Sequence, residues 1–586
     1  VNFPCAAQNI HPTAFARFVK SPFPGGRSGN LAGTRCVIAR NVVAASDHPL
    51  RKRYMLEDWF QPVQGLQGLK PAKEVRLILG DQLNAMHSWF SGEPEPEVIY
   101  VMMEMRQETD YAPHHLQKVV AFFGAMRLFA SERASADHRI FYLTLDDSRN
   151  LQSLTDNLDW IMSDVGAKRV TYQLPDEYRL DEQLSIWGDA VQDRGLEIAV
   201  ADTEHFYTQR EELALFFKGK KTYRLENFYR AMRKKHEVLM TVVGEPEGGS
   251  WNYDASNRQK LPKDHMPPLP LTLDRNVEGL VEVIAASGVE TTGRIDAKRF
   301  GWPITRAEGL QVLEYFVDEL LPHFGDFQDA LTTNSWSVYH SRLSFVMNAK
   351  LLSPAEVVSR VEQAYQLQPE RIDISQAEGF IRQILGWREY MRGVYWAHMP
   401  EYETLNFFEH KRALPSWFWT GKTKMACVSH AIDQTMEHAY AHHIQRLMVT
   451  GNFALLAGIH PDELDAWYLG VYIDALQWVE ITNTRGMSQF ADGGIVGSKP
   501  YVSSAQYLKK MGHYCKGCHY DPNEKVGEKA CPFNALYWDF YERHREKLER
   551  NPRIGMAYRT WDRMDPDKQR ALLDTAAMNL NRLEEL

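Results

Sequence analysis

The sequence predicts an α/β, Rossmann-like domain followed by an all-α domain. Two observations carry this prediction. Between residues 74 and 202, apolar runs of strand length alternate with helical patterns, and from about residue 305 to the end the pattern is helical, broken by Gly/Pro loops. The predicted boundaries are an N-terminal extension at 1–73, the α/β domain at 74–202, a connector at 203–304 and the helical domain at 305–586.

The α/β prediction depends on five apolar runs with helical stretches between them. Because strands that alternate with helices form parallel sheets covered by helices, we expect one parallel sheet here. The clearest helical stretches are His115–Arg133 and Leu151–Val165. The expected strands are Val75–Leu79, Val98–Met103, Ile140–Leu145, Val170–Leu174 and Ile198–Val200.

A polar turn, Gly80-Asp81-Gln82, follows the first expected strand directly. In parallel α/β sheets, ligands bind outside the carboxyl ends of the strands, so Asp81 is a candidate ligand-binding residue. No GxGxxG motif follows, which argues against a dinucleotide site and leaves either a ring-shaped ligand or a plain polar turn.

The segments outside the two domains are less regular. Residues 244–270 are rich in Gly, Pro, Asn and Asp and read as a long connector. Residues 1–46 contain four Arg and no acidic residue, and the first Met is Met55. This profile suits a transit peptide or a start codon placed too far upstream, and we exclude the segment from the fold prediction.

Composition limits the classes of function. The net charge of −9 argues against a generally basic nucleic-acid binder, although a local basic patch suffices for DNA. No run approaches the roughly 18 apolar residues of a membrane span. Six cysteines in 586 residues do not form a disulfide framework and favour a reducing, cytoplasmic setting, or an organelle if the extension is a transit peptide.

Four of the cysteines form a pattern typical of a metal centre. Cys515 and Cys518 are separated by two residues, Cys531 follows after twelve and precedes a proline, and Cys427 is the fourth candidate ligand. The spacing alone leaves zinc and a 4Fe–4S cluster open, and the Cys-Pro pair favours iron–sulfur.

A second candidate site is the stretch 437–448, which contains no helix breaker. A continuous helix through it would place His443 on the apolar face, with His442 on the next stripe near Arg446. A lone histidine on such a face is usually a core residue. Two adjacent histidines beside an arginine are better candidates for a general acid near neutral pH.

Two further stretches suggest anion binding. His340-Ser341-Arg342-Leu343-Ser344 offers hydroxyl groups and a guanidinium at the start of a helical run, as a phosphate site or a plain helix cap would. A basic zone near aromatic residues suits a DNA-facing surface, or simply solvated charge. Its basic residues are Arg382, Arg388, Arg392, Lys411, Arg412, Lys422 and Lys424, and its tryptophans are Trp387, Trp417 and Trp419.

These motifs together resemble the iron–sulfur bacterial cryptochromes and photolyases, also called prokaryotic (6-4) photolyases. The resemblance runs from about residue 74 to the end. It is carried by Ser341-Arg342-Leu343-Ser344, Trp387-Arg388-Glu389, Trp-Thr-Gly-Lys-Thr at 419–423, Ala-His-His-Ile-Gln-Arg-Leu-Met at 441–448 and Cys-Pro-Phe-Asn-Ala-Leu-Tyr-Trp-Asp-Phe at 531–540.

The resemblance implies an N-terminal antenna domain and a C-terminal FAD-binding domain, with three cofactors. A 4Fe–4S cluster would be held by Cys427, Cys515, Cys518 and Cys531. FAD would lie near Ser341, Leu343, Ser344, Arg388, Asp474 and Glu480. A 6,7-dimethyl-8-ribityllumazine antenna would be held by Asp81, Glu108 and Tyr111.

The resemblance also implies an activity: light-driven repair of (6-4) photoproducts in UV-damaged DNA by a monomeric enzyme. Excited reduced FAD would supply the electron and a histidine the proton, with His443 favoured over His442 as donor. Tyr501 and Tyr507 would lie near the lesion, and Trp467, Tyr468 and Trp419 would carry electrons to the flavin. The Asn that most photolyases place near the flavin has no counterpart in Tyr472–Glu480.

Two alternatives remain open from the sequence. A cryptochrome-type blue-light photoreceptor would share the cofactors without repairing DNA. A DNA-binding protein with zinc or iron–sulfur and no flavin would explain the cysteines and the basic zone alone.

Overall fold

The computed structural model describes residues 54–55 and 71–586, except 221 and 263. The predicted extension therefore lies almost entirely outside the described residues, and its nature stays a prediction. No helix in the described part is long and apolar enough to cross a membrane.

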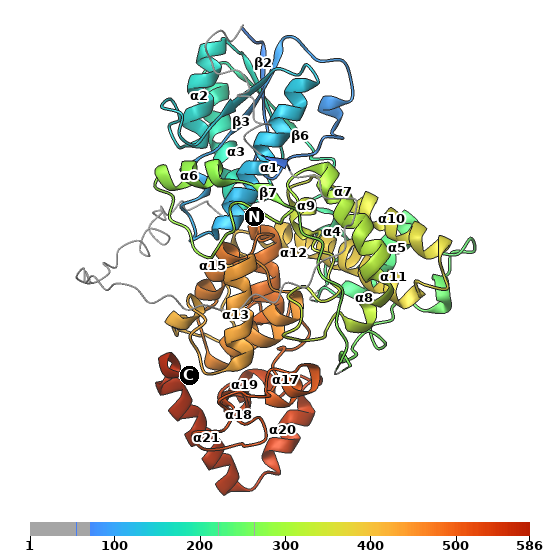
Figure 1. The fold of residues 1–586 in the computed structure, drawn as a ribbon, viewed down its shortest axis with the longest axis vertical. Coiled ribbons are helices and arrows are strands. Elements are labelled where there is room, and N and C mark those ends of the chain that lie inside the picture. The colour runs from blue at the N-terminus through green and yellow to red at the C-terminus, as the bar shows by residue number, and fades with distance from the viewer. Residues whose placement is uncertain (1–53, 56–70, 221, 263) are drawn as a thin grey trace, which may run out of the picture. The chain divides into compact units, whose positions relative to one another are not determined.

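A five-stranded parallel sheet forms from the first apolar runs, as predicted (Figure 1). The strand order is β4-β3-β2-β5-β6. The order changes direction between β2 and β5, and this topological switch point is typical of Rossmann-like sheets. Val75 of β2 pairs with Ile99 of β3 on one side and with Val170 of β5 on the other. The strands are β2 (Glu74–Leu77), β3 (Val98–Met103), β4 (Ile140–Leu143), β5 (Arg169–Gln173) and β6 (Glu197–Ala201).

Helices cover both faces of this sheet, which explains why its central strands are apolar without alternation. Tyr100 and Met102 of β3 join the same core cluster as helix α1 (Leu116–Ser135). Ile99 and Val101, which point to the other face, pack with α2 (Leu154–Val165) and α3 (Tyr178–Asp193). Both helical stretches predicted from the sequence are thus confirmed.

The connecting region contains short elements only. The short strands β1 (Tyr54–Met55) and β7 (Arg275–Asn276) pair in parallel. The helices here are α4 (Glu212–Phe216), α5 (Leu225–His236) and α6 (Glu278–Ala286). The segment predicted as a connector, 244–270, is irregular over most of its described residues and contains one short 3-10 helix, Glu247–Gly249.

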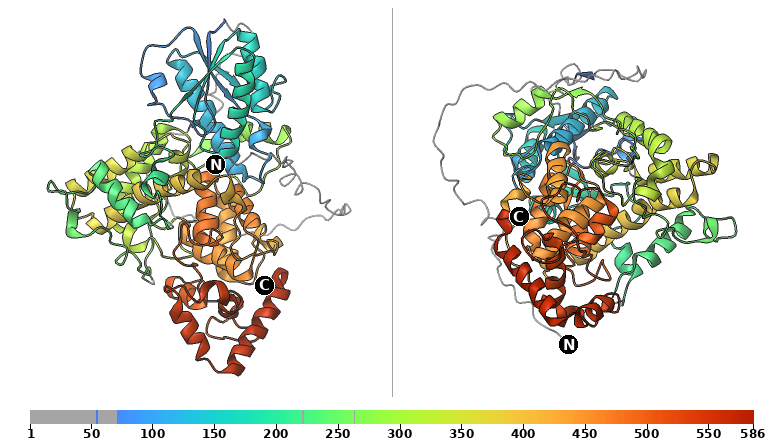
Figure 2. Two further views of the ribbon diagram at one scale, coloured as in Figure 1. Left: turned by 180° about the vertical axis from the view of Figure 1, so that it is seen from behind. Right: turned by 60° about the horizontal axis from the view of Figure 1, so that its bottom comes forward.

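From residue 306 onward the described chain is helical, as predicted. The helices α17 to α21 lie at the end opposite to the sheet (Figures 1 and 2). The α-helices are α7 (Arg306–Tyr315), α8 (Leu321–Phe327), α9 (Ser344–Asn348), α10 (Pro354–Leu367), α11 (Ile374–Ile381), α12 (Glu389–His398), α13 (Ala426–His438), α14 (Asn452–Ala457), α15 (Pro461–Val471), α16 (Gln477–Ile481), α17 (Ala505–Met511), α18 (Pro532–Arg543), α19 (Arg545–Leu548), α20 (Gly555–Asp562) and α21 (Pro566–Asn581).

Four segments of this helical region are π-helical rather than α-helical. They are Phe316–Leu320, Arg382–Arg388, Gln445–Gly451 and Thr482–Ser488. π-helical turns are rare and concentrate at functional sites. The second carries Arg388 and the fourth follows Glu480, both predicted to contact the flavin, while the third follows the predicted catalytic histidines.

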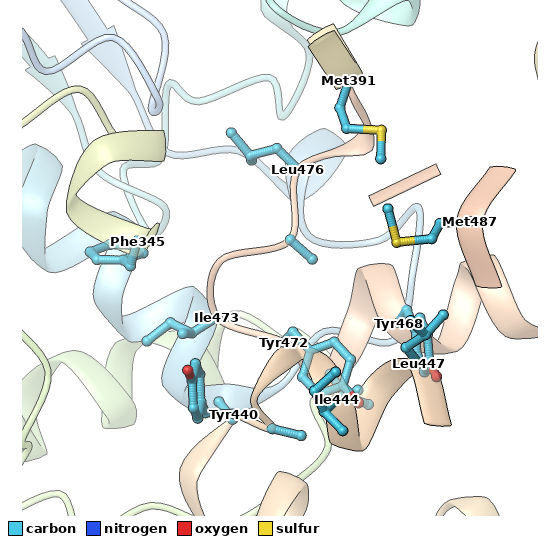
Figure 3. Packing of buried hydrophobic residues seen from close by; sticks show 14 of the residues in the cluster. Phe345, Met391, Tyr440, Ile444, Leu447, Tyr468, Tyr472, Ile473, Leu476 and Met487 are labelled. Atoms are coloured by element: carbon cyan, nitrogen blue, oxygen red, sulfur yellow. The ribbon is translucent and has the colours of Figure 1, made fainter. Parts of the chain in front are cut away.

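The segment from Tyr472 to Leu476 runs through the core between α15 and α16. Figure 3 shows Tyr472, Ile473 and Leu476 among buried side chains that include Phe345 and Ile444. This segment brings the sheet region and the helical region against one another and takes part in both sites described below.

Candidate functional site

A cavity opens at the carboxyl ends of β2, β3 and β5, next to the point where the strand order reverses. The three residues predicted to hold the antenna, Asp81, Glu108 and Tyr111, all line it. The sequence prediction did not include two acidic residues of the same wall, Asp176 and Glu177. Their signal was available, because they follow β5 as Asp81 follows β2.

The polar wall of this cavity is fixed by charge pairs. Arg179 of α3 donates to both carboxylate oxygens of Glu108, at 3.0 and 2.5 Å. The same guanidinium lies 4.1 Å from the centre of the Tyr111 ring, within cation–π distance. Burial raises the pKa of Asp81 to about 6. The cavity therefore offers aromatic and apolar walls with a few oriented polar groups, which fits a flat heteroaromatic ligand.

The two motifs predicted to bind phosphate and to hold the catalytic histidines come together in space. The rings of His340 and His442 stack with centroids 4.8 Å apart. Ser344 donates a hydrogen bond to the Asp474 carboxylate at 2.7 Å, and Arg446 forms an ion pair with the same carboxylate at 3.0 Å. Residues about 100 positions apart in the sequence thus form one polar cluster.

The predicted continuous helix at 437–448 is wrong. Helix α13 ends at His438, Ala439 adopts a left-handed conformation with φ of 52°, and helical structure resumes only at His443. Residues outside the break form hydrogen bonds with its backbone groups. Ile473 N–H donates to Ala439 O at 2.9 Å, and the Gln445 side chain accepts from His442 N–H at 3.1 Å.

The break exchanges the expected positions of the two histidines. His442 is buried and its Nδ1 has no hydrogen-bond partner, whereas the His443 side chain is exposed. Burial, reinforced by His340, lowers the pKa of His442 well below its ordinary value. Partial loss of solvent around the ring, with the nearby positive charge of Arg446, lowers the pKa of His443 below its ordinary value. Both rings are therefore neutral near pH 7 in the absence of a ligand.

Arg388 is the clearest candidate for holding an anionic group of a cofactor. Its guanidinium is buried, and Nη2 lies 3.2 Å from both Met347 O and the Asn348 side-chain oxygen. Its Nε and Nη1 are buried with no hydrogen-bond partner. Burial lowers its pKa to about 10. A buried guanidinium with two unused donors fits an anionic ligand such as a flavin phosphate.

The other residues predicted to contact FAD are buried or half-buried. Leu343 is buried and precedes α9, while Ser341 and Ser344 are half-buried. Glu480, on α16, accepts a hydrogen bond from Thr484 at 2.5 Å. Burial, with the nearby Asp465, raises the pKa of Glu480 well above its ordinary value.

The prediction of an exposed basic zone is wrong for Arg382, Arg388 and Arg392, which are all buried. Arg388 and Arg392 do share a face, because both guanidinium groups lie over the Phe206 ring, at 4.7 and 3.8 Å. Tertiary packing buries this face of α12, which a charge count along the sequence does not detect. Lys411, Lys422, Lys424 and Trp419 are exposed.

Two of the three predicted electron carriers are in contact. The Trp467 and Tyr468 rings lie 5.4 Å apart, and both are buried. Trp419 is 37% exposed and neighbours Phe418, whose ring lies 5.2 Å from Trp467. Trp419 therefore lies at the surface and Trp467 in the core, and the electron route between them stays a prediction.

The predicted lesion tyrosines are half-buried, Tyr501 in a loop and Tyr507 on α17. Burial raises the pKa of both phenols, so both stay protonated at neutral pH. Within the described part of the chain, neither ring contacts His442 or His443. Their assignment stays a prediction.

The four cysteines predicted to bind a metal centre are free and line one apolar cavity. Cys427 lies at the start of α13 and Cys531 immediately before α18, whereas Cys515 and Cys518 lie in the loop between α17 and α18. Over the described residues, no three or more His, Cys, Asp or Glu are arranged to hold a single metal ion.

Comparison with known proteins agrees with the motifs. A family described as deoxyribodipyrimidine photo-lyase-related protein matches residues 76–300. Two solved structures align with low scores. A bacterial class III photolyase from Agrobacterium tumefaciens has a TM-score of 0.47 at 16% identity, covering 74% of this chain and 82% of its own. A cryptochrome from Synechocystis has a TM-score of 0.49 at 13% identity, covering 86% and 94%.

The relationship is much stronger at the level of sequence. The (6-4) photolyase of Agrobacterium fabrum is 41% identical to this chain over 510 residues, which are 87% of this chain and 99% of the relative. Identity of this extent over nearly the whole relative shows that the chain belongs to the (6-4) photolyase family, the family that its cysteine, histidine and serine motifs resemble.

Proposed function

We propose that this protein is a light-driven DNA repair enzyme that restores (6-4) pyrimidine–pyrimidone photoproducts in UV-damaged DNA, acting as a monomer. The observation that carries the proposal is the meeting of the His340–Ser344 and His442–Arg446 motifs beside a buried guanidinium, Arg388, in a chain of this family. Reduced FAD, when bound and photoexcited, would supply an electron to the lesion and take it back.

The residues of this chain would position and polarise the reactants. Arg388 would hold an anionic group of FAD, and Ser341, Leu343 and Ser344 would contact its phosphates. Asp474 and Glu480 would lie near the flavin ring. Trp467, Tyr468 and Trp419 would supply electrons that reduce it. Residues 305–586 would thus form the FAD-binding and lesion-binding region.

One of the two histidines would donate the proton that the repair reaction needs. The sequence favoured His443, and its exposure leaves the ring accessible to a flipped-out damaged nucleotide. His442, stacked on His340 with a free Nδ1, would tune or assist it. Because both rings are neutral near pH 7 without a ligand, the donor would have to gain its proton when the anionic DNA binds and raises its pKa.

The remaining cofactors have supporting sites. Residues 74–202 would form the antenna domain, with 6,7-dimethyl-8-ribityllumazine in the cavity lined by Asp81, Glu108 and Tyr111. The four cysteines, which line one apolar cavity, would hold a 4Fe–4S cluster. The cluster would tie α13 to the segment before α18 and act structurally.

The experiment that tests the proposal uses an oligonucleotide with a single (6-4) photoproduct, blue light and chromatography of the products. The wild-type protein, loaded with reduced FAD, should restore the two pyrimidines. The H442A/H443A variant should keep FAD and iron, yet lose repair by about 100-fold or more, as expected when a general acid is removed.

Two outcomes would contradict the proposal at different levels. Full repair by H442A/H443A would overturn the histidine assignment while leaving the activity intact. An unchanged oligonucleotide after illumination with the wild-type protein would overturn repair, and photoreduction of the flavin in that same sample would then favour the photoreceptor function.

A further inference from the structure

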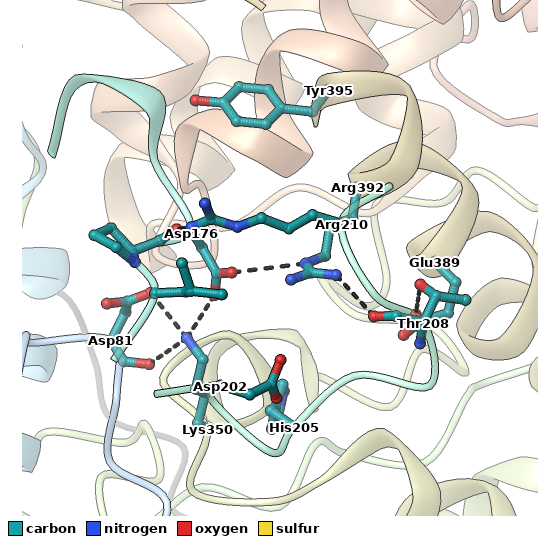
Figure 4. Close-up of polar contacts among 12 residues, drawn as sticks. Asp81, Asp176, Asp202, His205, Thr208, Arg210, Lys350, Glu389, Arg392 and Tyr395 are labelled. Carbon is teal, nitrogen blue, oxygen red and sulfur yellow. Dashed lines mark hydrogen bonds and ion pairs between the residues drawn. The ribbon is translucent and has the colours of Figure 1, made fainter. Parts of the chain in front are cut away.

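Lys350 is a buried cation at the wall of the sheet cavity, and the proposed repair chemistry gives it no role. Its side chain is 1% exposed. Its Nζ lies 2.8 Å from Asp81 O, 2.9 Å from Asp81 Oδ2 and 2.6 Å from Asp176 Oδ2. Figure 4 shows the amino group pointing between the two aspartates. The ammonium group therefore donates two hydrogen bonds to Asp81 and forms an ion pair with Asp176.

The backbone around Lys350 is shaped to deliver this side chain. Lys350 follows α9 in a left-handed conformation, with φ of 62°. That conformation is strained for a residue other than glycine and persists only where surrounding contacts fix it. One such contact is the hydrogen bond from Leu83 N–H to Ala349 O, at 3.0 Å. The turn after β2 is thus held to the turn after α9 by both backbone and side chain.

Lys350 balances the negative charge of two buried aspartates. Asp81 and Asp176 share its ammonium group, and the next cation, Arg392, lies 3.6 Å from Asp176 rather than beside Asp81. Although burial opposes it, the two aspartates raise the pKa of Lys350, so it stays charged. Lys350 is therefore the cation that keeps the Asp81 carboxylate ionised and fixed in direction.

Asp81 is the residue through which this arrangement reaches the cavity. Lys350 engages its Oδ2, and the side chain remains 14% exposed at the cavity wall. We propose that Lys350 is a positioning residue for the antenna. It orients the Asp81 carboxylate toward the ligand, so that tight binding in the sheet cavity requires the turn that follows α9.

This inference rests on the proposed antenna function and adds to it a residue from outside the sheet region. A positioning role for Lys350 can be distinguished from a purely structural role of its ion pairs. A structural role predicts that replacing Lys350 lowers stability and leaves ligand affinity unchanged in the folded fraction. A positioning role predicts a loss of affinity in protein that is fully folded.

The test is a fluorescence titration of 6,7-dimethyl-8-ribityllumazine into full-length, FAD-containing protein purified without antenna. K350M should bind the lumazine about ten-fold more weakly or worse, the effect of losing one charge-assisted hydrogen bond. The FAD content per chain should not change. K298M removes a lysine of an exposed ion pair with Glu278 and should bind like the wild type.

A second pair of variants covers the case in which K350M does not fold. D176N/K350M leaves one buried carboxylate without the ammonium group instead of two, which should restore folding. It should bind the lumazine about ten-fold more weakly than D176N alone, in which Lys350 still reaches Asp81.

The outcomes separate the two proposals. Equal lumazine affinity in K350M and the wild type, or in D176N/K350M and D176N, would overturn the role of Lys350. Absence of lumazine binding by the wild-type protein would overturn the antenna assignment of the cavity itself.

Discussion

Buried histidines are the residues whose charge depends most on their surroundings in this protein. His115 is fully buried at the start of α1, where its Nδ1 accepts from Gln117 N–H at 3.1 Å. Its Nε2 lies 3.0 Å from Met436 O and donates to it, which fixes the neutral tautomer. Burial lowers the pKa of His115 to about 4.

This histidine should make the protein sensitive to acid. Its pKa in the folded state lies below the ordinary value of about 6.5, so its contribution is complete above that pH and is lost as the pH falls toward 4. The loss is on the order of 3 kcal/mol at the lower limit. H115N keeps a side chain able to cap α1 and removes the titration.

We therefore expect the melting temperature of H115N to fall less than that of the wild type between about pH 7.5 and about pH 5. Differential scanning fluorimetry of the two proteins in matched buffers measures this. Parallel curves for the two proteins would show that His115 does not contribute to acid sensitivity.

At the level of elements, the strands were the most predictable part of the structure. All six residues of β3 are buried, and such a strand must be apolar throughout whatever else the chain does. The position of Asp81 directly after β2 also predicted where the cavity lies, because ligands in parallel sheets bind at the carboxyl ends of the strands. The sequence also brought out three of the four cysteines by their close spacing, and Cys427 as the remaining candidate, and all four line one cavity.

The errors arose where distant partners decide the local conformation. The chain from 439 to 442 has helical propensity, yet Ile473 and Gln445 offer its backbone other hydrogen-bond partners. The π-helical segments and the burial of Arg388 have the same origin. Lys350 gave no signal because its partners lie on other elements, and Arg179 gave none because its partner in the cavity wall, Glu108, is distant in the sequence.

The cysteine loop offers a test at this scale. Cys427 begins α13, whereas its three expected co-ligands lie at 515–531. C427S should lose the iron and free the 512–531 loop from α13, which increases proteolysis of that loop. C36S changes a cysteine outside the described residues and should keep the iron content of the wild type. Iron analysis and limited proteolysis of both variants measure this.

Full iron retention in C427S would exclude this residue as a ligand. Loss of iron in C36S would show that the four-cysteine assignment is incomplete.

For the whole molecule, buried hydrogen-bond donors without partners indicate that a bound ligand stabilises the folded state. Arg388 keeps two buried donors without partners, which is costly unless a ligand engages them. Binding of FAD to the folded state alone should stabilise the entire chain, by about 2.7 kcal/mol at a concentration 100 times the dissociation constant.

R388M should therefore bind FAD about ten-fold more weakly or worse and lose most of the rise in melting temperature that FAD causes. R360M removes an arginine paired with Glu314 at the surface and serves as the control, with an unchanged response to FAD. Thermal melts with and without added FAD measure both. A normal FAD-dependent rise in R388M would exclude Arg388 from the flavin site.

The segment from Tyr472 to Leu476 has one more consequence. Leu476 lines the sheet cavity, and two residues earlier Asp474 holds Ser344 and Arg446. Because one short segment borders the sheet cavity and also fixes the Asp474 cluster, a substitution that shifts its backbone should alter both places together.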